Sequence, residues 1–102
     1  MEKRNYKEVT SGNPDTSVWV IPTGNEVNIY EMGGNAALLS TVFVKIVWGD
    51  EILFSTHGDI IVKALTTLCG DGVKELKIVL INDSGVAQTI GAYFLYEEEV
   101  AS

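Results

Sequence analysis

The sequence contains a single histidine, His57, and a carboxylate, Asp59, follows it two positions later. A carboxylate close to a histidine can orient the imidazole as a general base. Such a base also needs a nucleophile, which folding would have to supply from Ser55, Thr56 or Cys69. The simpler interpretation is a polar turn between two strands. We therefore predict no catalytic residues and no enzymatic activity, and we keep a small hydrolase that uses His57 and Asp59 as a third hypothesis.

Five carboxylates lie in or beside predicted turns: Asp50, Glu51, Asp59, Asp71 and Asp83. If several of these turns met at one end of the fold, their oxygens would suit Ca²⁺. The chain lacks the dense Asp-x-Asp-x-Asp-Gly spacing of a calcium-binding loop. Paired glycine and aspartate are also ordinary turn residues. We predict no metal site and no cofactor.

Aromatic side chains on a sheet face can stack on sugars or anchor a subunit interface. Trp48 follows the apolar alternation of its segment and is predicted to enter the core. Tyr30 and Tyr93 project from faces opposite the strongest apolar alternation. Together with Trp19 they are our interface candidates, and core packing is the alternative for each of the three.

Composition limits the classes of function. The chain has 102 residues, enough for one domain, and 46% of them are hydrophobic. Fourteen acidic and seven basic residues give a net charge of −7, which argues against binding to nucleic acid or to an anionic membrane. The apolar runs are far shorter than the ~20 residues that span a bilayer, and the N-terminal residues have no apolar signal segment. These features alone lead us to expect a cytoplasmic protein.

The apolar segments predict strands. Their residues alternate or are rich in β-branched side chains, and glycine, asparagine and aspartate separate them. Gly49-Asp50 predicts a tight hairpin, and Gly91 is a candidate bulge. The single cysteine, Cys69, excludes an intrachain disulfide and is predicted to be a small buried hydrophobe. The predicted strands span residues 17–21, 26–32, 41–48, 51–56, 60–69, 74–81 and 86–96.

These segments recur every eight to twelve residues, and no convincing helix accompanies them. Such spacing predicts an all-β antiparallel sandwich of about seven or eight strands. Residues 1–16 are polar and show no period, so we predict a flexible N-terminal arm followed by one β-sandwich domain over residues 17–102.

A succession of strands and turns runs over about residues 18–96 and includes Trp19-Val-Ile-Pro-Thr-Gly24, Val44-Lys-Ile-Val-Trp-Gly-Asp50 and Ile90-Gly-Ala-Tyr-Phe94. It resembles the small β-sandwich proteins of bacteriophage and prophage virions or tails. The resemblance implies a jelly-roll-like fold, a structural or adhesive role, and frequently a trimer, and it implies a virion location if the chain comes from a phage. It carries over no functional residue.

Residues 41–48 and 76–81 are apolar on both faces, which suggests that other copies of the chain bury the second face. Our first hypothesis is therefore a non-enzymatic, homo-oligomeric structural module. The resemblance implies that the oligomer is a trimer and that the module is a phage or prophage virion component, which contacts other virion proteins or surface glycans. The alternative is a carbohydrate-binding, lectin-like module, with or without Ca²⁺.

Overall fold

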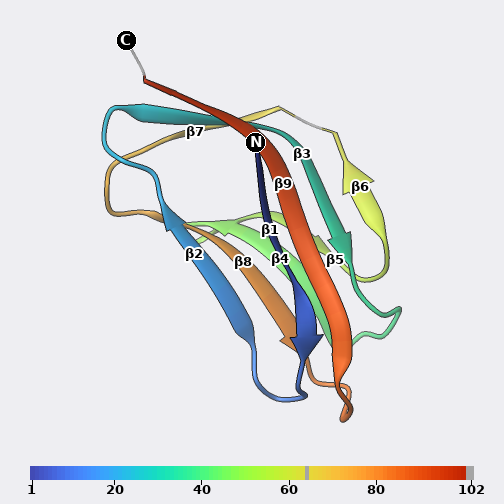
Figure 1. Cartoon of the computed structure of the whole chain (residues 1–102). Helices are drawn as coiled ribbons and strands as arrows, with labels where there is room; N and C mark the ends of the chain where they lie inside the picture. Colours follow the sequence, from blue (N-terminus) through green and yellow to red (C-terminus); the bar gives the residue numbers. More distant parts are fainter. Residues whose placement is uncertain (64, 101–102) are drawn as a thin grey trace.

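The computed structural model describes residues 1–63 and 65–100 and folds them into two antiparallel β-sheets that pack face to face (Figure 1). No part of these residues forms an apolar helix long enough to cross a membrane. In chain order the nine strands of the described residues are β1 (Glu2–Val9), β2 (Asp15–Val20), β3 (Asn25–Asn35), β4 (Val42–Trp48), β5 (Glu51–Thr56), β6 (Ile60–Val62), β7 (Thr66–Cys69), β8 (Glu75–Asn82) and β9 (Gln88–Val100).

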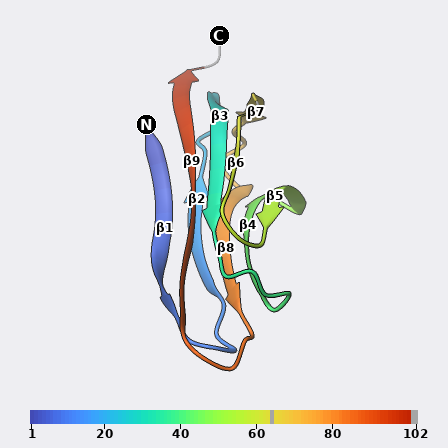
Figure 2. The ribbon, with the colours of Figure 1, turned by 90° about the vertical axis from the view of Figure 1, so that its right-hand side faces the viewer.

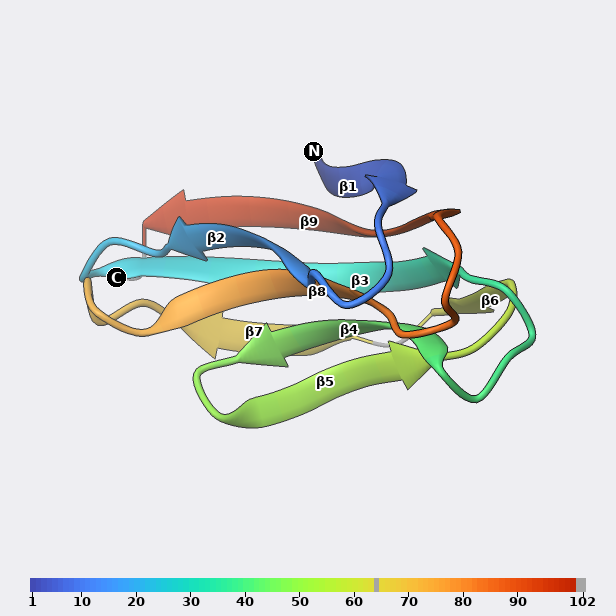
Figure 3. The same ribbon diagram turned by 90° about the horizontal axis from the view of Figure 1, so that it is seen from below.

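The strand order identifies the topology. The first sheet has the order β1-β9-β3-β6, with β7 pairing another part of β3, and the second sheet has the order β2-β8-β4-β5. The chain crosses between the sheets at every connection except the β4–β5 hairpin and the step from β6 to β7. Two four-position sheets connected in this way form a jelly roll, and the two layers are visible in Figure 3. The predicted jelly-roll-like antiparallel sandwich is confirmed.

The core lies between the two sheets and is built from alternate residues of the long strands. Val42, Val44 and Ile46 of β4 are fully buried, as their alternation predicted. Ile90 and Phe94 of β9 supply the opposite layer and are at most 1% exposed. Because successive side chains of a strand point to opposite faces, the alternate positions Gly91, Tyr93 and Leu95 of β9 lie on the outer face of the first sheet.

The predicted hairpin at Gly49-Asp50 is confirmed, because Trp48 pairs directly with Glu51. Gly49 has a φ of +60°, a backbone conformation that glycine adopts without steric cost. Trp48 is 7% exposed and belongs to the core, as predicted.

The prediction of an N-terminal arm over residues 1–16 is wrong, because Glu2–Val9 is strand β1 and pairs with β9 over its whole length. Figure 2 shows β1 at the edge of the sandwich beside β9. Only Asn5 and Val9 of this strand are buried. An edge strand with two buried residues shows no apolar alternation, so the residue pattern does not predict it. The sandwich domain therefore includes β1.

Two further strand predictions need correction. The segment 60–69 is two short strands, β6 and β7, which pair with separate parts of β3. The register of β3 against β9 shifts at Tyr30, whereas β9 pairs regularly through Gly91. Because a bulge shifts the side-chain alternation by one residue, Met32 is buried although Tyr30 is 44% exposed.

The two sheets are joined along the β1 and β2 edges by a polar seam. The Asn5 Nδ2 atom donates a hydrogen bond of 2.7 Å to Asp15 Oδ2, and Lys7 Nζ lies 3.3 Å from Asp15 Oδ1. The hydrogen bond from Asn5 lowers the pKa of the Asp15 carboxyl; the smaller effect of burial opposes it, and Lys7 lowers the pKa further. Beside this pair, the Lys3 ammonium lies 5.5 Å from the centre of the Trp19 ring.

Asn82, the last residue of β8, is a buried polar residue that is 1% exposed. Its amide nitrogen donates to the carbonyl oxygens of Val9 and Val86, both at 2.8 Å. Its Oδ1 accepts from the backbone nitrogen and the hydroxyl of Ser84, at 3.0 and 2.7 Å. One buried amide therefore fixes the end of β1 and the β8–β9 turn together.

The outer face of the second sheet carries the apolar residues that suggested contact with other copies. Part of this face is covered within the chain. Val47 is buried, Phe43 is half-buried, and the Lys45 ammonium lies 5.6 Å from the centre of the Phe43 ring, so the lysine stem lies along the apolar surface. The apolar side chains that stay more than a third exposed on this sheet are Val18, Val20 and Ile52.

Candidate ligand-binding groove

A groove of about 560 Å³ lies on the outer face of the first sheet. Strands β1, β9, β3 and β6 each contribute to it, so its residues come from both ends of the sequence. A volume of this size is in the range of small-molecule sites in proteins. The lining residues are Arg4, Tyr6, Gly34, Asn35, Asp59, Ile60, Ile61, Gly91, Ala92 and Tyr93.

The floor of the groove depends on two glycines that each lie beneath a tyrosine ring. Tyr6 of β1 is directly opposite Gly91 of β9, and Tyr93 of β9 is directly opposite Gly33 of β3. A Cβ atom at Gly33 would overlap the Tyr93 ring, and one at Gly91 would overlap the Tyr6 ring. Each ring therefore lies against the backbone of the neighbouring strand. A tyrosine covering a cross-strand glycine is a known way to stabilise a β-sheet.

The two tyrosines form adjacent platforms on one face. Gly91 and Tyr93 are two residues apart on β9, a spacing of about 6.8 Å along a strand. Both rings lean toward the next strand in the order β1-β9-β3. Tyr6 is 51% exposed, and Tyr93 is half-buried. The groove thus presents two neighbouring aromatic surfaces to the solvent.

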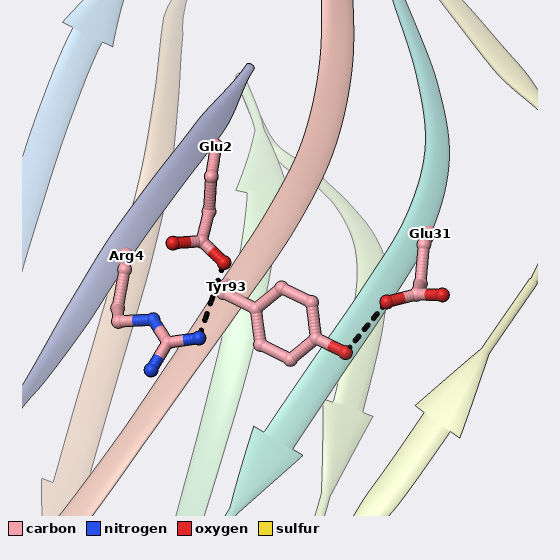
Figure 4. Close-up of polar contacts among 4 residues, drawn as sticks. All are labelled: Glu2, Arg4, Glu31 and Tyr93. Carbon is pink, nitrogen blue, oxygen red and sulfur yellow. Dashed lines mark hydrogen bonds and ion pairs between the residues drawn. The ribbon is translucent and has the colours of Figure 1, made fainter.

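Polar contacts fix the orientation of Tyr93 (Figure 4). Its hydroxyl donates a 2.8 Å hydrogen bond to Glu31 Oε2, and the Arg4 guanidinium carbon lies 5.4 Å from the ring centre. Arg4 Nη2 also pairs with Glu2 Oε1 at 3.1 Å, and Lys63 Nζ lies 3.9 Å from Glu31 Oε1. Burial, followed by the hydrogen bond to Glu31, raises the pKa of the Tyr93 phenol. The phenol therefore stays neutral and keeps donating at neutral pH.

The polar residues of the groove carry both signs of charge. Arg4 lines it from β1, Asn35 ends β3, and Asp59 precedes β6. Guanidinium groups only donate hydrogen bonds, ionised carboxylates only accept them, and amides do both. With one cationic and one anionic side chain, the groove lining is formally neutral although the chain is strongly acidic.

The structure separates the predicted interface aromatics. Tyr93 lies in the groove, whereas Tyr30 is the exposed bulge residue of β3 and does not line it. Trp19 packs edge-on against the core residue Phe94, with 5.7 Å between ring centres, so its contacts are with the sandwich interior and Lys3. Tyr6 was missed because it lies in the segment predicted as an arm. Only Asn5 and Val9 of that segment are buried, so no apolar alternation marks it as a strand.

The proposed catalytic pair does not form. His57 is exposed, and its Nδ1 atom lies 2.7 Å from the carbonyl oxygen of Val42. A carbonyl oxygen only accepts, so Nδ1 carries the hydrogen in this contact. The imidazole packs against Phe43, and Asp59 instead lines the groove. The geometry therefore gives the hydrolase hypothesis no base oriented by a carboxylate.

The turn carboxylates do not converge. Asp71 accepts hydrogen bonds from the backbone nitrogens of Val73 and Lys74 at 2.9 and 2.6 Å, which lower the pKa of its carboxyl and stabilise its own turn. Its neighbour Gly70 bonds to Asn25 at one end of the sandwich, whereas Asp83 bonds to Thr41 at the other end. Within the described residues no three histidine, cysteine or acidic side chains are placed to hold a metal ion.

Cys69 is exposed at the end of β7, so the prediction of a buried cysteine is wrong. It is the last residue of a four-residue strand whose inward-facing member is Leu68. Because side chains alternate along the strand, the buried position of Leu68 directs Cys69 to the solvent.

Comparisons with protein-family models, with characterised protein sequences and with solved structures found no match to this chain. The candidate site therefore rests on the geometry of the groove.

Proposed function

We propose that this protein is a non-enzymatic carbohydrate-binding module and that the groove on the β1-β9-β3-β6 face holds a neutral oligosaccharide. The observation that carries the proposal is the pair of tyrosine platforms, Tyr6 over Gly91 and Tyr93 over Gly33, on the floor of an open groove. The sequence left this function as the alternative to a virion component.

The two tyrosine rings suit the apolar face of a sugar. A pyranose ring presents a face of C–H bonds, and an exposed aromatic ring provides a matching flat surface. Tyrosine also loses little conformational freedom on binding, because its ring has few rotatable bonds. Tyr6 and Tyr93 are already held against the sheet backbone, so little ordering remains when a ligand arrives.

The polar residues of the groove suit the hydroxyl groups of a sugar. Sugar hydroxyls both donate and accept, and the groove offers donors from Arg4, an acceptor in Asp59 and both functions in Asn35. The opposite charges of Arg4 and Asp59 give no net preference for an ionic ligand. A neutral polyhydroxylated chain therefore suits this lining better than a phosphate or a nucleic acid does.

The test is binding of the full chain to an array of neutral oligosaccharides, followed by affinity measurements with single variants. Tyr6→Ala removes one platform, and Tyr30→Ala is the matched control, because Tyr30 is also exposed on this sheet but lies outside the groove. Loss of one aromatic contact of about 0.5–1.5 kcal/mol should weaken binding by a factor of roughly 2 to 13. Tyr30→Ala should leave the affinity unchanged.

Two results would overturn the proposal. One is an array without binding in the presence and absence of Ca²⁺, together with no thermal shift on adding Ca²⁺. The other is a bound oligosaccharide whose affinity falls equally with Tyr6→Ala and Tyr30→Ala. Circular dichroism of each variant establishes that the fold is retained.

The virion assignment stays a prediction, and with it the trimer and the virion location. A carbohydrate-binding module on a phage particle would unite both hypotheses, because virion modules can adhere to surface glycans. Detection of the chain in purified particles would support it, and its recovery only from the cytoplasm of producing cells would count against it.

A further inference from the structure

Strand β6 forms an apolar sheet edge. Within the described residues it pairs only with β3. Ile60, Ile61 and Val62 are 45%, 64% and 36% exposed, so no residue of this strand is covered. Two leucines near this edge are also exposed. Leu65, three residues after β6, is 76% exposed, and Leu38, whose side chain lies beside Gly58 in the turn before β6, is 86% exposed. An edge of this kind is open to pairing with another strand.

The opposite edge of the same sheet is protected. Strand β1 carries five charged residues among its eight, and charged side chains are a common defence of sheet edges. Strand β5, the corresponding edge of the second sheet, is interrupted by a bulge near Leu53. Strand β6 has neither charge nor bulge, and charge appears only at its two flanking positions, Asp59 and Lys63.

The charges of Asp59 and Lys63 determine which strand can pair with the free edge of β6. In an antiparallel pairing of Asp59–Lys63 with a second copy centred on Ile61, Asp59 of each copy lies opposite Lys63 of the other. Ile60 then faces Val62 in both directions. Opposite charges placed directly across an antiparallel pair stabilise it, whereas like charges destabilise it. A one-residue slip would break both ion pairs, so the sequence of this edge selects one register.

We infer that two copies of this chain associate through β6 and that the antiparallel β6–β6 pair, with Asp59 opposite Lys63 at both ends, joins their first sheets into one continuous sheet. The contact is isologous and closes as a two-fold dimer. Directly paired residues share one face of a sheet, so the two grooves lie on the same side. The dimer would therefore display two binding grooves to one surface, which favours bivalent attachment.

The interface is small, so we expect a dimer that dissociates on dilution. The experiment is light scattering after size exclusion on the ligand-free full chain, in a series from about 1 mM to 1 μM, the range that separates weak from firm association. At the highest concentration the expected mass is twice the chain mass of 11.1 kDa. A chain that stays monomeric throughout, or a stable trimer, would overturn the inference.

Variants locate the contact. Ile61→Lys places two like charges opposite each other at the centre of the pair and should abolish the dimer at every concentration tested. Ile52→Lys is the matched control, because Ile52 is a comparably exposed isoleucine on edge strand β5, at 56%. A dimer that survives Ile61→Lys, or that is lost equally with Ile52→Lys, would contradict pairing through β6.

Charge reversal tests the register. Asp59→Lys and Lys63→Asp should each raise the dissociation constant at least threefold, and the double variant should restore most of the wild-type value. Failure of the double variant to recover would rule out the proposed register. These mass measurements use no ligand, so their failure is distinguishable from a failure of the glycan proposal.

Discussion

Tyr93 lies directly across the strand pair from Gly33, and its ring occupies the space that a Cβ atom at Gly33 would need. The hydroxyl of the same ring donates to Glu31, two residues before Gly33 on β3. The pairing of Tyr93 with Gly33 therefore determines both the floor of the groove and the orientation of the Tyr93 ring. Replacing either residue should alter the other.

Gly33→Ala should destabilise the fold by about 1–3 kcal/mol, because the added methyl group forces the ring out of its position. Thermal unfolding of four chains tests the cause: wild type, Gly33→Ala, Tyr93→Ala and the double variant. With the ring absent, Gly33→Ala should add little to the loss seen for Tyr93→Ala. An equal cost of Gly33→Ala in both backgrounds would show that its effect does not pass through Tyr93.

The raised pKa of Tyr93 predicts an alkaline loss of stability. A group whose pKa is higher in the folded than in the unfolded chain stabilises the fold fully below its unfolded pKa, about 10 for tyrosine, and loses that contribution as the pH rises through the folded value. Tyr93→Phe should therefore be less sensitive to pH than wild type in this range. The ionisation of Tyr93 can be followed as the difference in phenolate absorbance between wild type and Tyr93→Phe. Glu31→Gln should move this ionisation to lower pH. No change with Glu31→Gln would contradict the contact in Figure 4.

The polar seam at Asp15 predicts a loss of stability at acidic pH, whereas Tyr93 predicts a loss at alkaline pH. The lowered pKa of Asp15 means that its contribution is present above the unfolded value near 3.8 and is lost as the pH falls through the folded value. Asp15→Ala also leaves the buried Asn5 amide without its acceptor, at a cost of about 1–2 kcal/mol near neutral pH. Urea unfolding at neutral and strongly acidic pH should show this cost shrinking in acid. A constant difference at both pH values would refute the assignment.

Asn82 should be the most sensitive polar position. Asn82→Ala removes a buried side chain that makes four hydrogen bonds, and it leaves the Val9 carbonyl without its amide donor and the Val86 carbonyl with the Ser84 hydroxyl alone, so we expect a loss of about 2–4 kcal/mol. Asn82→Asp should also destabilise the fold, since a carboxylate cannot donate to Val9 and Val86. Asn13→Ala is the control, because in the part of the chain that the structure describes the Asn13 side chain bonds only to Thr10, on the surface. Chemical unfolding measures all three, and comparable losses for Asn13 and Asn82 would contradict the anchor role.

The sequence predicted the sandwich and the β4–β5 hairpin because β4 and β8 alternate strongly and the hairpin turn is glycine-aspartate. It missed β1, whose burial is confined to Asn5 and Val9, and it placed a bulge at Gly91 and not at Tyr30, because a bulge leaves no mark in a single sequence. Tyr93 was a candidate from its outward position, but the groove was beyond prediction. Its floor exists only because register sets Gly91 beneath Tyr6 and Gly33 beneath Tyr93, and register depends on pairings between distant segments.

We propose that the tyrosine-lined face of the first sheet binds a neutral oligosaccharide. The most direct measurement is an NMR titration of the ¹⁵N-labelled chain with neutral oligosaccharides that bind on the array. We predict that shift changes concentrate at the backbone amides of Gly34, Asn35, Gly91 and Ala92, and that Tyr6→Ala suppresses them while Tyr30→Ala does not. Shift changes confined to the outer face of the β2-β8-β4-β5 sheet, or no saturable change with any oligosaccharide, would contradict the account.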